Sequence, residues 1–556
     1  MGFVGGEIMC RKRLLLLLVV ICLFLQGGKW LQGTSANEFA DMANTFEKFV
    51  DELPIPPVIR ARHYGQRDLV MTLTQFKFKL HRDLPETLEW GYNGISPGPT
   101  IEVEEGQKIR VHWKNELPTT HILKSPRGSD MGGNTPLPDV RNVTHLHGAV
   151  VYESDPMSKK IDSDGWPDNF TIPGEEQLAE YPNRQSARTL WYHDHAVATT
   201  GRNVATGLEG LYVIHDEYER SLNLPSGKFE IPLLIMARSI GGGGTLIYSN
   251  IISSEMYGNA IAVNGKLWPF VNVEPRKYRF RIVNGSNARA YDMKIIDAAN
   301  RSAGPPIYQI GSDAGFLEHT AALGDASDPL SPRLSLAPAE RADVIIDFSK
   351  FSGRDFMLDN SNRDARDGEI ALPQLLLFKV GTALSEPDTS ALPMHMRPIR
   401  RIKETSAAMT RQIVINQETL PSGDLVLNLN GKRWDDPITE KPVLGTTEIW
   451  EVVNTQPDVH PLHIHLVEFQ VLDRRPFDVK AYADTGKIVY TGPAVPPDPN
   501  EMGWKDTVRA NNGAVTRIII HFGPNPGYYV YHCHILEHED MDMMRPFQIV
   551  EPSEQW

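Results

Sequence analysis

The 556-residue chain is poor in cysteine. It has three, and two of them, Cys10 and Cys22, lie in an apolar N-terminal segment. If that segment is removed, Cys533 is the only thiol and no internal disulfide can form. A free thiol in an exported protein is open to oxidation unless a bound partner occupies it. The scarcity of cysteine therefore directs attention to the surroundings of Cys533.

Long hydrophobic runs are also lacking. The N-terminal run, residues 14–25, has 12 residues, whereas a helix needs roughly 20 to cross a bilayer. Basic residues precede it and the small residues Thr34 and Ala36 follow it, a pattern typical of a secretory signal peptide over residues 1–36. We expect cleavage before Asn37, export through the endoplasmic reticulum and no membrane span in the mature chain. An uncleaved signal anchor is the alternative.

Positive charge is in deficit. Residues 1–36 hold four basic residues and one acidic residue, so the rest has 52 Lys and Arg against 69 Asp and Glu, a formal charge of −17. Such a surface disfavours nucleic acid and attracts cations. Export is also consistent with four glycosylation sequons, at Asn142, Asn169, Asn284 and Asn300.

Helical periodicity is nearly absent. The best candidate is residues 37–53, whose apolar residues recur at helical spacing, and we expect it to be a packing arm. A turn-and-strand pattern instead occurs three times, at Asn93-Gly94, Asn264-Gly265 and Asn430-Gly431, which are 171 and 166 residues apart. In each copy the second strand has alternate apolar residues, which predicts one face on a core and the other in water.

The repeat sets the domain organisation. A period near 170 is too long for a solenoid and fits a whole β-sandwich. We therefore predict an all-β chain with an arm at 37–58 and three sandwich domains at 59–220, 221–390 and 391–556. Three fused sandwiches can close an interdomain site within one chain, so a monomer suffices.

Ten of the 18 histidines fall in four clusters: HLHG at 145–148, WYHDH at 191–195, HPLHIH at 460–465 and HCHILEH at 532–538. On a strand, residues two apart point the same way, so each cluster can present two imidazoles to one face. One such pair is usually structural. Four pairs, confined to the first and third repeats, predict eight nitrogen ligands for three copper ions. The pairs are His145/His147, His193/His195, His463/His465 and His532/His534.

Cys533 points away from its neighbours His532 and His534, so its sulfur can bind a separate copper ion. A thiolate, two histidines and a distant methionine are the ligands of a trigonal blue copper site. His460, His538 and Met543 complete that set, while Met541 and Met544 are expected to pack. His112, His215, His319 and His521 have no partner at ligand spacing and are interpreted as ordinary histidines.

The four motifs, with DSDG at 162–165, resemble those of three-domain multicopper oxidases of the spore-coat laccase and bilirubin oxidase branch, from residue 93 to residue 548. In overall sequence the chain is most similar to the plant LOW PHOSPHATE ROOT ferroxidases. The resemblance implies cupredoxin-like Greek-key sandwiches and four copper ions. It assigns type 1 copper to His460, Cys533, His538 and Met543, type 2 copper to His145 and His463, and the type 3 pair to His147, His193, His195, His465, His532 and His534.

Two acids also match the family pattern. The resemblance implies that Glu539 and Asp164 deliver protons to reduced dioxygen, which needs four. A surface or capping carboxylate is the alternative for each. If the plant similarity holds, it further implies iron redox control in the cell-wall space under phosphate limitation.

The electron donor remains open, since it depends on the surroundings of His460. Asp458 lies two residues before His460 and could hold Fe²⁺ in a hard-oxygen site that favours Fe³⁺. Glu255 and Asp367, or Asp364 in its place, could supply further ligands from the second domain. The first hypothesis is a secreted ferroxidase that oxidises Fe(II) with O2.

The second hypothesis is a laccase-type oxidase of phenols or bilirubin-like pigments, which needs an open, partly apolar pocket at His460. A cuprous oxidase is disfavoured because no methionine-rich segment is present. A copper-binding protein without turnover is the third hypothesis, and the complete ligand set argues against it.

Overall fold

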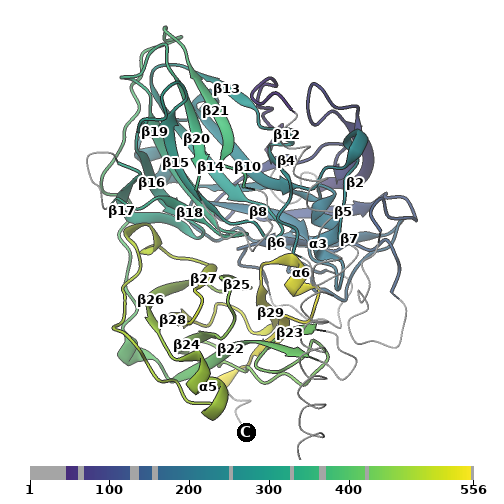
Figure 1. The fold of residues 1–556 in the computed structure, drawn as a ribbon. Helices are drawn as coiled ribbons and strands as arrows, with labels where there is room; N and C mark the ends of the chain where they lie inside the picture. The colour runs from purple at the N-terminus through teal and green to yellow at the C-terminus, as the bar shows by residue number, and fades with distance from the viewer. Residues whose placement is uncertain are drawn as a thin grey trace, which may run out of the picture.

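The computed structural model describes residues 46–60, 68–124, 137–152, 161–249, 255–325, 331–361, 371–419 and 425–552. The predicted signal peptide, residues 1–36, and the start of the arm lie outside these ranges. Within them, no helix has the length and apolar character needed to cross a membrane. Strands form six sheets that pair into three sandwiches, which confirms the predicted fold class (Figure 1).

The first sandwich uses strands between residues 58 and 215. Its two sheets meet over a core that includes Trp90, Trp113 and Tyr192. The sheet that carries the first two histidine clusters has the order β1 (Val58–Arg60), β4 (Gly98–Glu104), β9 (Glu209–His215), β8 (Arg188–Asp194) and β6 (Thr144–His147). The other has the order β3 (Thr87–Tyr92), β2 (Leu69–Phe78), β5 (Ile109–Asn115) and β7 (Glu176–Tyr181).

The second sandwich lies between residues 230 and 380 and has a core of its own. Its larger sheet has the order β12 (Lys266–Leu267), β11 (Ala260–Val263), β10 (Glu230–Arg238), β14 (Lys277–Asn284), β19 (Arg341–Asp347), β16 (Ile307–Ser312) and β17 (Gly315–Leu323). The other has the order β13 (Phe270–Val273), β21 (Gln374–Val380), β20 (Asp355–Asn360), β15 (Tyr291–Asp297) and β18 (Leu334–Leu336).

The third sandwich lies between residues 409 and 549, and its core is continuous with that of the first. One sheet has the order β23 (Leu425–Leu429), β22 (Met409–Thr419), β24 (Thr447–Asn454), β28 (Ala514–His521) and β26 (Phe469–Pro476). The other carries the last two histidine clusters and has the order β27 (Thr507–Ala510), β25 (His460–Ile464), β29 (Gly527–Cys533) and β30 (Met544–Ile549). The predicted domain limits, 220/221 and 390/391, fall between the three sets of strands.

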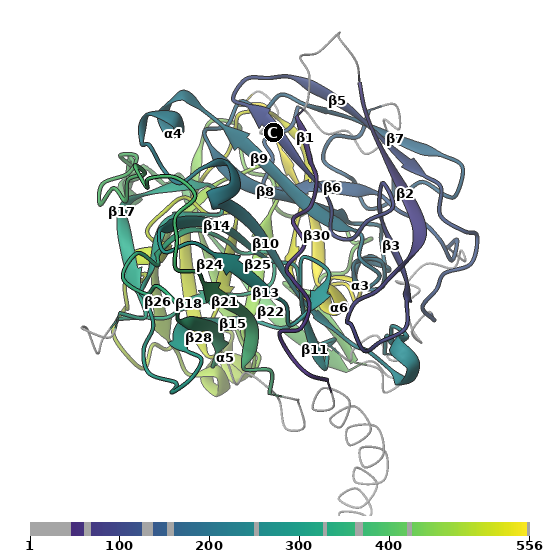
Figure 2. The ribbon, with the colours of Figure 1, turned by 90° about the horizontal axis from the view of Figure 1, so that it is seen from above.

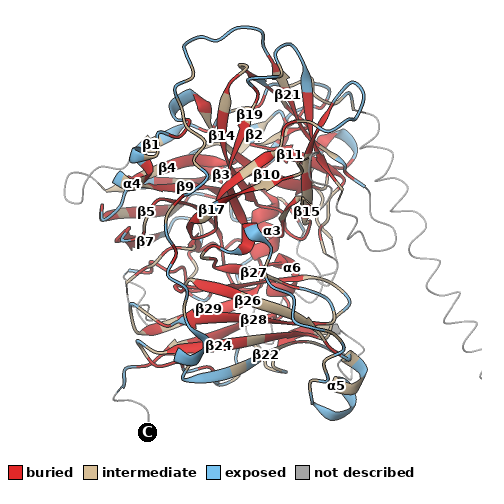
Figure 3. Cartoon of the chain, turned by 90° about the vertical axis from the view of Figure 1, so that its left-hand side faces the viewer, coloured by how far each residue is buried: buried red, intermediate tan, exposed pale blue. Residues whose placement is uncertain are grey.

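Short α-helices connect the strands: α3 (Thr200–Ala205), α4 (Glu217–Ser221), α5 (Val479–Thr485) and α6 (Leu536–Glu539). The 3-10 turns are η1 (Gly227–Phe229), η2 (Gly242–Gly244), η3 (Glu404–Ser406) and η4 (Pro499–Glu501). Helix α5 projects from the third sandwich with its residues exposed or half-buried (Figure 3). Helices α3 and α6, by contrast, meet between the first and third sandwiches, where the backbone N–H groups of Thr200 and Gly201 donate to the Asp540 carboxylate at 2.8 and 2.9 Å.

The threefold repeat is visible in the turns. Asn93, Asn264 and Asn430 all have positive φ, and so does the glycine after each, as this tight turn requires. Each asparagine side chain accepts a hydrogen bond from a backbone N–H of an earlier strand, at Thr72 of β2, Leu234 of β10 and Val414 of β22. The longer strand of each repeat, β5, β14 or β24, pairs in parallel with that same earlier strand, β2, β10 or β22.

The expectation that one face of each repeated strand meets water is wrong for β14 and β24. Only β5 alternates between buried and half-buried residues, whereas β14 and β24 are buried almost throughout. The outer face of β14 is covered because the first sandwich packs on it, with Arg279 and Arg281 paired to Glu219 of α4 at 2.8 and 2.7 Å. Viewed from above, β8 and β9 lie against the strands of the second sandwich (Figure 2).

The helix predicted over residues 37–53 is not present in its described part, residues 46–53, and the remainder lies outside the described ranges. This segment instead follows the second sandwich, with the N–H groups of Phe49 and Leu53 donating to the carbonyls of Trp268 and Phe270. Its apolar side chains pack on the second core. Contact with that core, rather than helical periodicity, sets its conformation.

Candidate metal centres

The eight histidines of the predicted cluster lie on four strands or one residue beyond them. β6 carries His145 and His147, and β8 carries His193 with His195 just after its end. In the sheet register His145 is opposite His193, and His463 of β25 is opposite His532 of β29. Cross-strand neighbours have adjacent side chains. Alternation along each strand and pairing between strands therefore bring the imidazoles together, as the spacing predicted.

These histidines meet between the first and third sandwiches, and each is at most 2% exposed. The Nε2 atom of His532 lies 3.2 Å from Nε2 of His195 and 3.3 Å from Nε2 of His465. His147 stacks on His463 with ring centroids 3.6 Å apart. Groups of three ligand atoms within 4.8 Å of one another include His145/His463/His465, His145/His147/His193 and His195/His465/His532.

Hydrogen bonds fix which ring nitrogen points into the cluster. Nδ1 of His145, His193 and His463 lies 2.5, 2.7 and 2.9 Å from a backbone carbonyl oxygen. A carbonyl accepts only, so Nδ1 carries the proton and Nε2 presents its lone pair. The Nε2 atom of all three is buried without a hydrogen-bond partner among the described residues.

Burial also keeps the imidazoles neutral. It lowers the pKa of His193 to about 3 and that of His195 to about 4, and it holds the pKa of His145 and His463 well below the usual range. Buried polar atoms without partners are costly and rare in folded proteins. Neutral, inward-facing lone pairs are what a cation needs, and among divalent first-row metals imidazole sites bind Cu²⁺ most strongly. The residues therefore fit copper.

The second metal centre is built around Cys533, which is fully buried and faces away from the cluster. Its Sγ atom lies 3.4 Å from Nδ1 of His460 and 3.8 Å from Nδ1 of His538. Met543 is also fully buried, and its carbonyl accepts a hydrogen bond from the Cys533 N–H at 3.0 Å. Burial raises the pKa of the Cys533 thiol, so a bound cation is needed to hold the thiolate. The structure thus brings together the four residues predicted to hold type 1 copper.

The two predicted proton-delivering acids both contact the histidine cluster. An Oε2 atom of Glu539 lies 3.0 Å from Nδ1 of His532, and Oε1 lies 3.6 Å from Nδ1 of His195. Burial raises the pKa of Glu539, but the two imidazoles outweigh it and leave the pKa lowered to about 2. Asp164 bonds Nδ1 of His465 at 3.0 Å, and burial holds its pKa well above the usual range. Their proton-transfer role stays a prediction.

Sequence reasoning missed Asp506. Its carboxylate lies 3.2 Å from Nε2 of His147, and its backbone carbonyl accepts from Nδ1 of His463. Arg341 of the second sandwich forms a fully buried two-point ion pair with the same carboxylate. Burial raises the pKa of Asp506, but Arg341 outweighs this and lowers it to about 2. A carboxylate behind a ligand imidazole orients the ring, and the only sequence signal was a charged residue beside a strand start.

The structure places the predicted iron ligands Glu255 and Asp458 in different surroundings. Glu255 reaches the third sandwich as predicted, but its Oε1 atom lies 2.8 Å from Nε2 of His538, and its side chain is 3% exposed. Asp458 lies on a cavity of about 310 Å³ beside His460. The rest of that cavity is mostly apolar, with Tyr257, Ala288, Ala290, Ala337, Pro338, Pro457, Val459, Pro461 and Ile535 beside Asn512. Asp367 and Asp364 lie outside the described residues.

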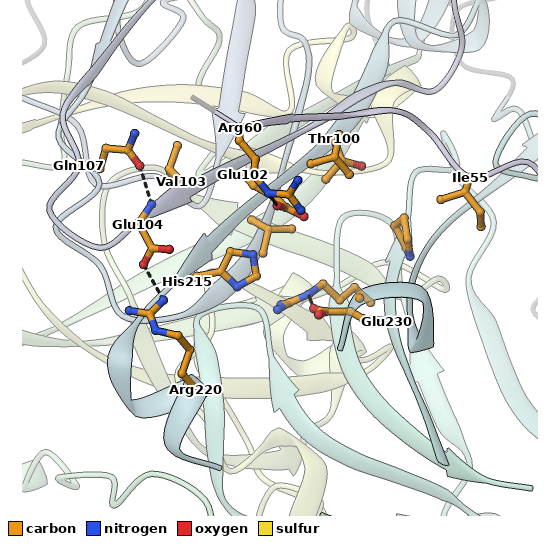
Figure 4. Close-up of a pocket in the computed structure, with 15 residues that line it drawn as sticks. Ile55, Arg60, Thr100, Glu102, Val103, Glu104, Gln107, His215, Arg220 and Glu230 are labelled. Atoms are coloured by element: carbon orange, nitrogen blue, oxygen red, sulfur yellow. Dashed lines mark hydrogen bonds and ion pairs between the residues drawn. The ribbon is translucent and has the colours of Figure 1, made fainter. Parts of the chain in front are cut away.

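Another cavity, of about 810 Å³, lies between the first and second sandwiches and holds none of the predicted ligands. Figure 4 shows its charged residues paired along the wall, with Arg60 3.0 Å from Glu102 and Arg220 2.8 Å from Glu104. His215, also in this wall, bonds Glu219 at 2.6 Å. The 310 Å³ cavity, whose wall includes both sequence neighbours of His460, is therefore the candidate electron-donor site.

The four sequons differ in accessibility. Asn142 and Asn284 are buried, and their amide nitrogens donate to Asp194 and to the carbonyls of Arg289 and Leu336. A glycan has no room at either residue, so the prediction is wrong there. Asn169 is 9% exposed, and Asn300 is the exposed member of the set.

Comparison with known proteins agrees with this geometry. Residues 78–134, 139–219 and 401–553 match the multicopper oxidase family. A laccase of Bacillus subtilis is 42% identical over 91% of this chain and 99% of its own length. The multicopper oxidase LPR1 of Arabidopsis thaliana is 32% identical over 98% of this chain and 100% of its own.

A bilirubin oxidase of Albifimbria verrucaria is 33% identical over 91% of this chain and 82% of its own length. The crystal structure of the McoA multicopper oxidase from Aquifex aeolicus shares the fold, with a TM-score of 0.72 at 24% identity over 91% of this chain and 100% of that one. With its two groups of buried ligands, the chain belongs to the multicopper oxidases, copper enzymes that oxidise a reductant with dioxygen.

Proposed function

We propose that this multicopper oxidase is a ferroxidase, which catalyses 4 Fe²⁺ + O2 + 4 H⁺ → 4 Fe³⁺ + 2 H2O. Copper bound at the two centres supplies a one-electron acceptor beside the small cavity and the four-electron reduction of dioxygen in the histidine cluster. The observation that carries the proposal is the contact between Glu255 and His538, 2.8 Å from Oε1 to Nε2.

Glu255 contacts one ligand imidazole of the Cys533 centre, and Asp458 lies close in sequence to another. Glu255 bonds His538 directly, and Asp458 lies two residues before His460 on the cavity wall. Carboxylates are hard ligands that favour Fe³⁺ over Fe²⁺. They therefore lower the reduction potential of the Fe³⁺/Fe²⁺ couple, which favours electron transfer from iron to the protein. An electron leaving iron held at Glu255 crosses one hydrogen bond to reach the His538 ring.

The test compares Fe²⁺ with a phenolic donor on one preparation by dioxygen consumption. We expect Glu255→Gln and Asp458→Asn each to lower kcat/KM for Fe²⁺ by about 10- to 100-fold and to leave phenol oxidation and the blue absorbance of the Cys533 centre unchanged. Asp292→Asn is the matched control, because Asp292 lines a neighbouring cavity but bonds Ser335 instead of a histidine. Equal losses with both donors would reject an iron site.

The second candidate function is oxidation of aromatic reductants such as phenols. The apolar lining of the 310 Å³ cavity favours it, and so do the laccases and bilirubin oxidase among the relatives. We expect Ala290→Phe, which fills this cavity, to raise KM for a phenol while changing KM for Fe²⁺ little. The opposite pattern would place the phenol elsewhere.

The proposed setting is the space outside the cell, with iron in the cell wall as substrate under phosphate limitation. It is supported by the signal-like segment at residues 1–36 and by the similarity to LPR1. Asn37 as the N-terminus of the purified protein would support export, whereas an intact Met1 would contradict cleavage.

A further inference from the structure

Two exposed histidines face each other far from the predicted ligands in sequence. His319, on β17, and His395, in the connection between the second and third sandwiches, are paired by an isolated antiparallel bridge. Their Nδ1 atoms lie 3.0 Å apart, with ring centroids 5.1 Å apart and planes at 76°. Spacing along the chain concealed this pair, because 76 residues separate the two histidines.

Backbone hydrogen bonds on both sides hold the pair in place. The Thr320 N–H donates to the Met394 carbonyl at 3.1 Å, and the Met396 N–H donates to the Glu318 carbonyl at 3.0 Å. The Thr320 hydroxyl donates to the Pro393 carbonyl at 2.6 Å. Met396, which is 4% exposed, packs into a small apolar cluster with Phe316 and Ile310. The two imidazoles are therefore preorganised by structure that does not depend on a ligand.

We propose that His319 and His395 form a surface copper(II) site, separate from the two centres of the catalytic machinery. With metal–nitrogen bonds of about 2.0 Å, two cis nitrogens of a square-planar ion lie about 2.8 Å apart, and two of a tetrahedral ion about 3.3 Å apart. The observed 3.0 Å falls between these values. Cu²⁺ is the divalent first-row ion that nitrogen ligands bind most strongly and it accepts square-planar geometry.

Charge and access favour a cation here. The whole chain carries a formal charge of −14, which raises the local concentration of cations. Both histidines are exposed, so an ion reaches them from solvent, and water can fill its remaining positions. When the ion binds, the ring whose Nδ1–H donated the hydrogen bond changes tautomer and carries its proton on Nε2, so the Nδ1 lone pairs of both rings face the ion.

The experiment uses the full enzyme, loaded with copper to four ions per chain and then equilibrated with a small excess of Cu²⁺ before desalting. We expect a fifth copper per chain by elemental analysis, with an electron paramagnetic resonance signal split by two equivalent nitrogens. His319→Ala and His395→Ala return the content to four and abolish that signal. His521→Ala, which removes an exposed histidine with no histidine partner among the described residues, keeps five.

The outcomes are distinct. Four coppers in the unsubstituted protein, or a fifth ion that survives both His319→Ala and His395→Ala, would overturn the proposal and leave the pair as a simple N–H···N hydrogen bond. Binding of Zn²⁺ without binding of Cu²⁺ would overturn the assignment to copper. Because copper bridges β17 and the connection, its addition should also raise Tm in the unsubstituted protein and in His521→Ala, but not in His395→Ala.

Discussion

The histidine cluster and the electron-donor cavity are built in different ways. The cluster lies between the first and third sandwiches, and its ligands sit on four paired strands or one residue beyond them. The cavity lies between the second and third sandwiches, and loops supply its wall, including Tyr257 and Asp458. Strands fix the chemistry that all multicopper oxidases share, whereas loops, which vary more readily, set the donor.

The second sandwich holds none of the predicted copper ligands, yet it contacts both centres. Through Arg341 it reaches Asp506, which bonds two cluster histidines, and through Glu255 it reaches His538. The sandwich therefore acts on each centre from behind a ligand. Each region has its own contact with the second sandwich, so a substitution at one contact should affect one region and not the other.

The largest effect is expected at the thiol that joins the two regions. Cys533→Ser removes the sulfur that lies 3.4 Å from Nδ1 of His460, so the blue absorbance disappears and oxidation of every donor falls to background. The cluster histidines keep their own contacts, so about three coppers remain per chain by elemental analysis. Met541→Leu, a packing change nearby, should retain both colour and turnover. Oxidation of any donor by the colourless variant would show that electrons can enter at the cluster directly.

The next effect concerns the contact from the second sandwich to the cluster. Asp506→Asn removes the two-point ion pair of the buried Arg341 and leaves the Asp313 carboxylate, 3.9 Å away, as its counter-ion, so the free energy of unfolding should fall by about 3 kcal/mol. Loss of the carboxylate behind His147 should also weaken copper binding at the cluster by about 10- to 100-fold, while the blue absorbance of the Cys533 centre is retained. Chemical denaturation and copper analysis measure the two effects.

Asp473→Asn is the matched control, because Asp473 pairs with Arg517 in a less buried position, where the two side chains are 13% and 26% exposed. Its cost should stay below about 1 kcal/mol. A loss of the blue band in Asp506→Asn with cluster copper intact would break the proposed division between the two regions.

The sequence predicts the cluster better than the cavity for a physical reason. The HxH spacing encodes a strand face, and the three Asn-Gly turns encode the repeat, because both are local properties of the backbone. Asp506 and Arg341 are brought together across 165 residues by domain packing, and nothing in their local sequence marks them. Contacts within the first and second sandwiches bury Asn142 and Asn284, whose local sequences form ordinary sequons.

Glu255 shows both the reach and the limit of such reasoning. Its position in a second-domain loop indicated that it could reach the third domain, and it does. The contact of Glu255 with His538 depends on the tertiary arrangement and could not be predicted from the sequence. The helix prediction for the arm is wrong at residues 46–53 for a related reason. The apolar spacing there suits a helix, but backbone hydrogen bonds to Trp268 and Phe270 hold the segment in an irregular conformation.

The smallest effect tests the loop that carries Asp164. Gly165 has φ of +78°, and an added Cβ would lie 2.8 Å from the Thr144 carbonyl oxygen and 3.0 Å from the His145 Cα. Gly165→Ala should therefore lower the free energy of unfolding by about 1–3 kcal/mol and shift the Asp164 carbonyl that fixes His145. Gly174→Ala, with φ of +96° but open space around the added Cβ, isolates the backbone strain.

Two half-reactions show which region the loop serves. Dioxygen reduction should slow in Gly165→Ala and not in Gly174→Ala, whereas reduction of the blue centre by the donor in the absence of dioxygen should keep its rate. That result would mean that the loop serves the cluster and not the cavity. Equal slowing of both half-reactions would mean that the two regions are coupled through the first sandwich.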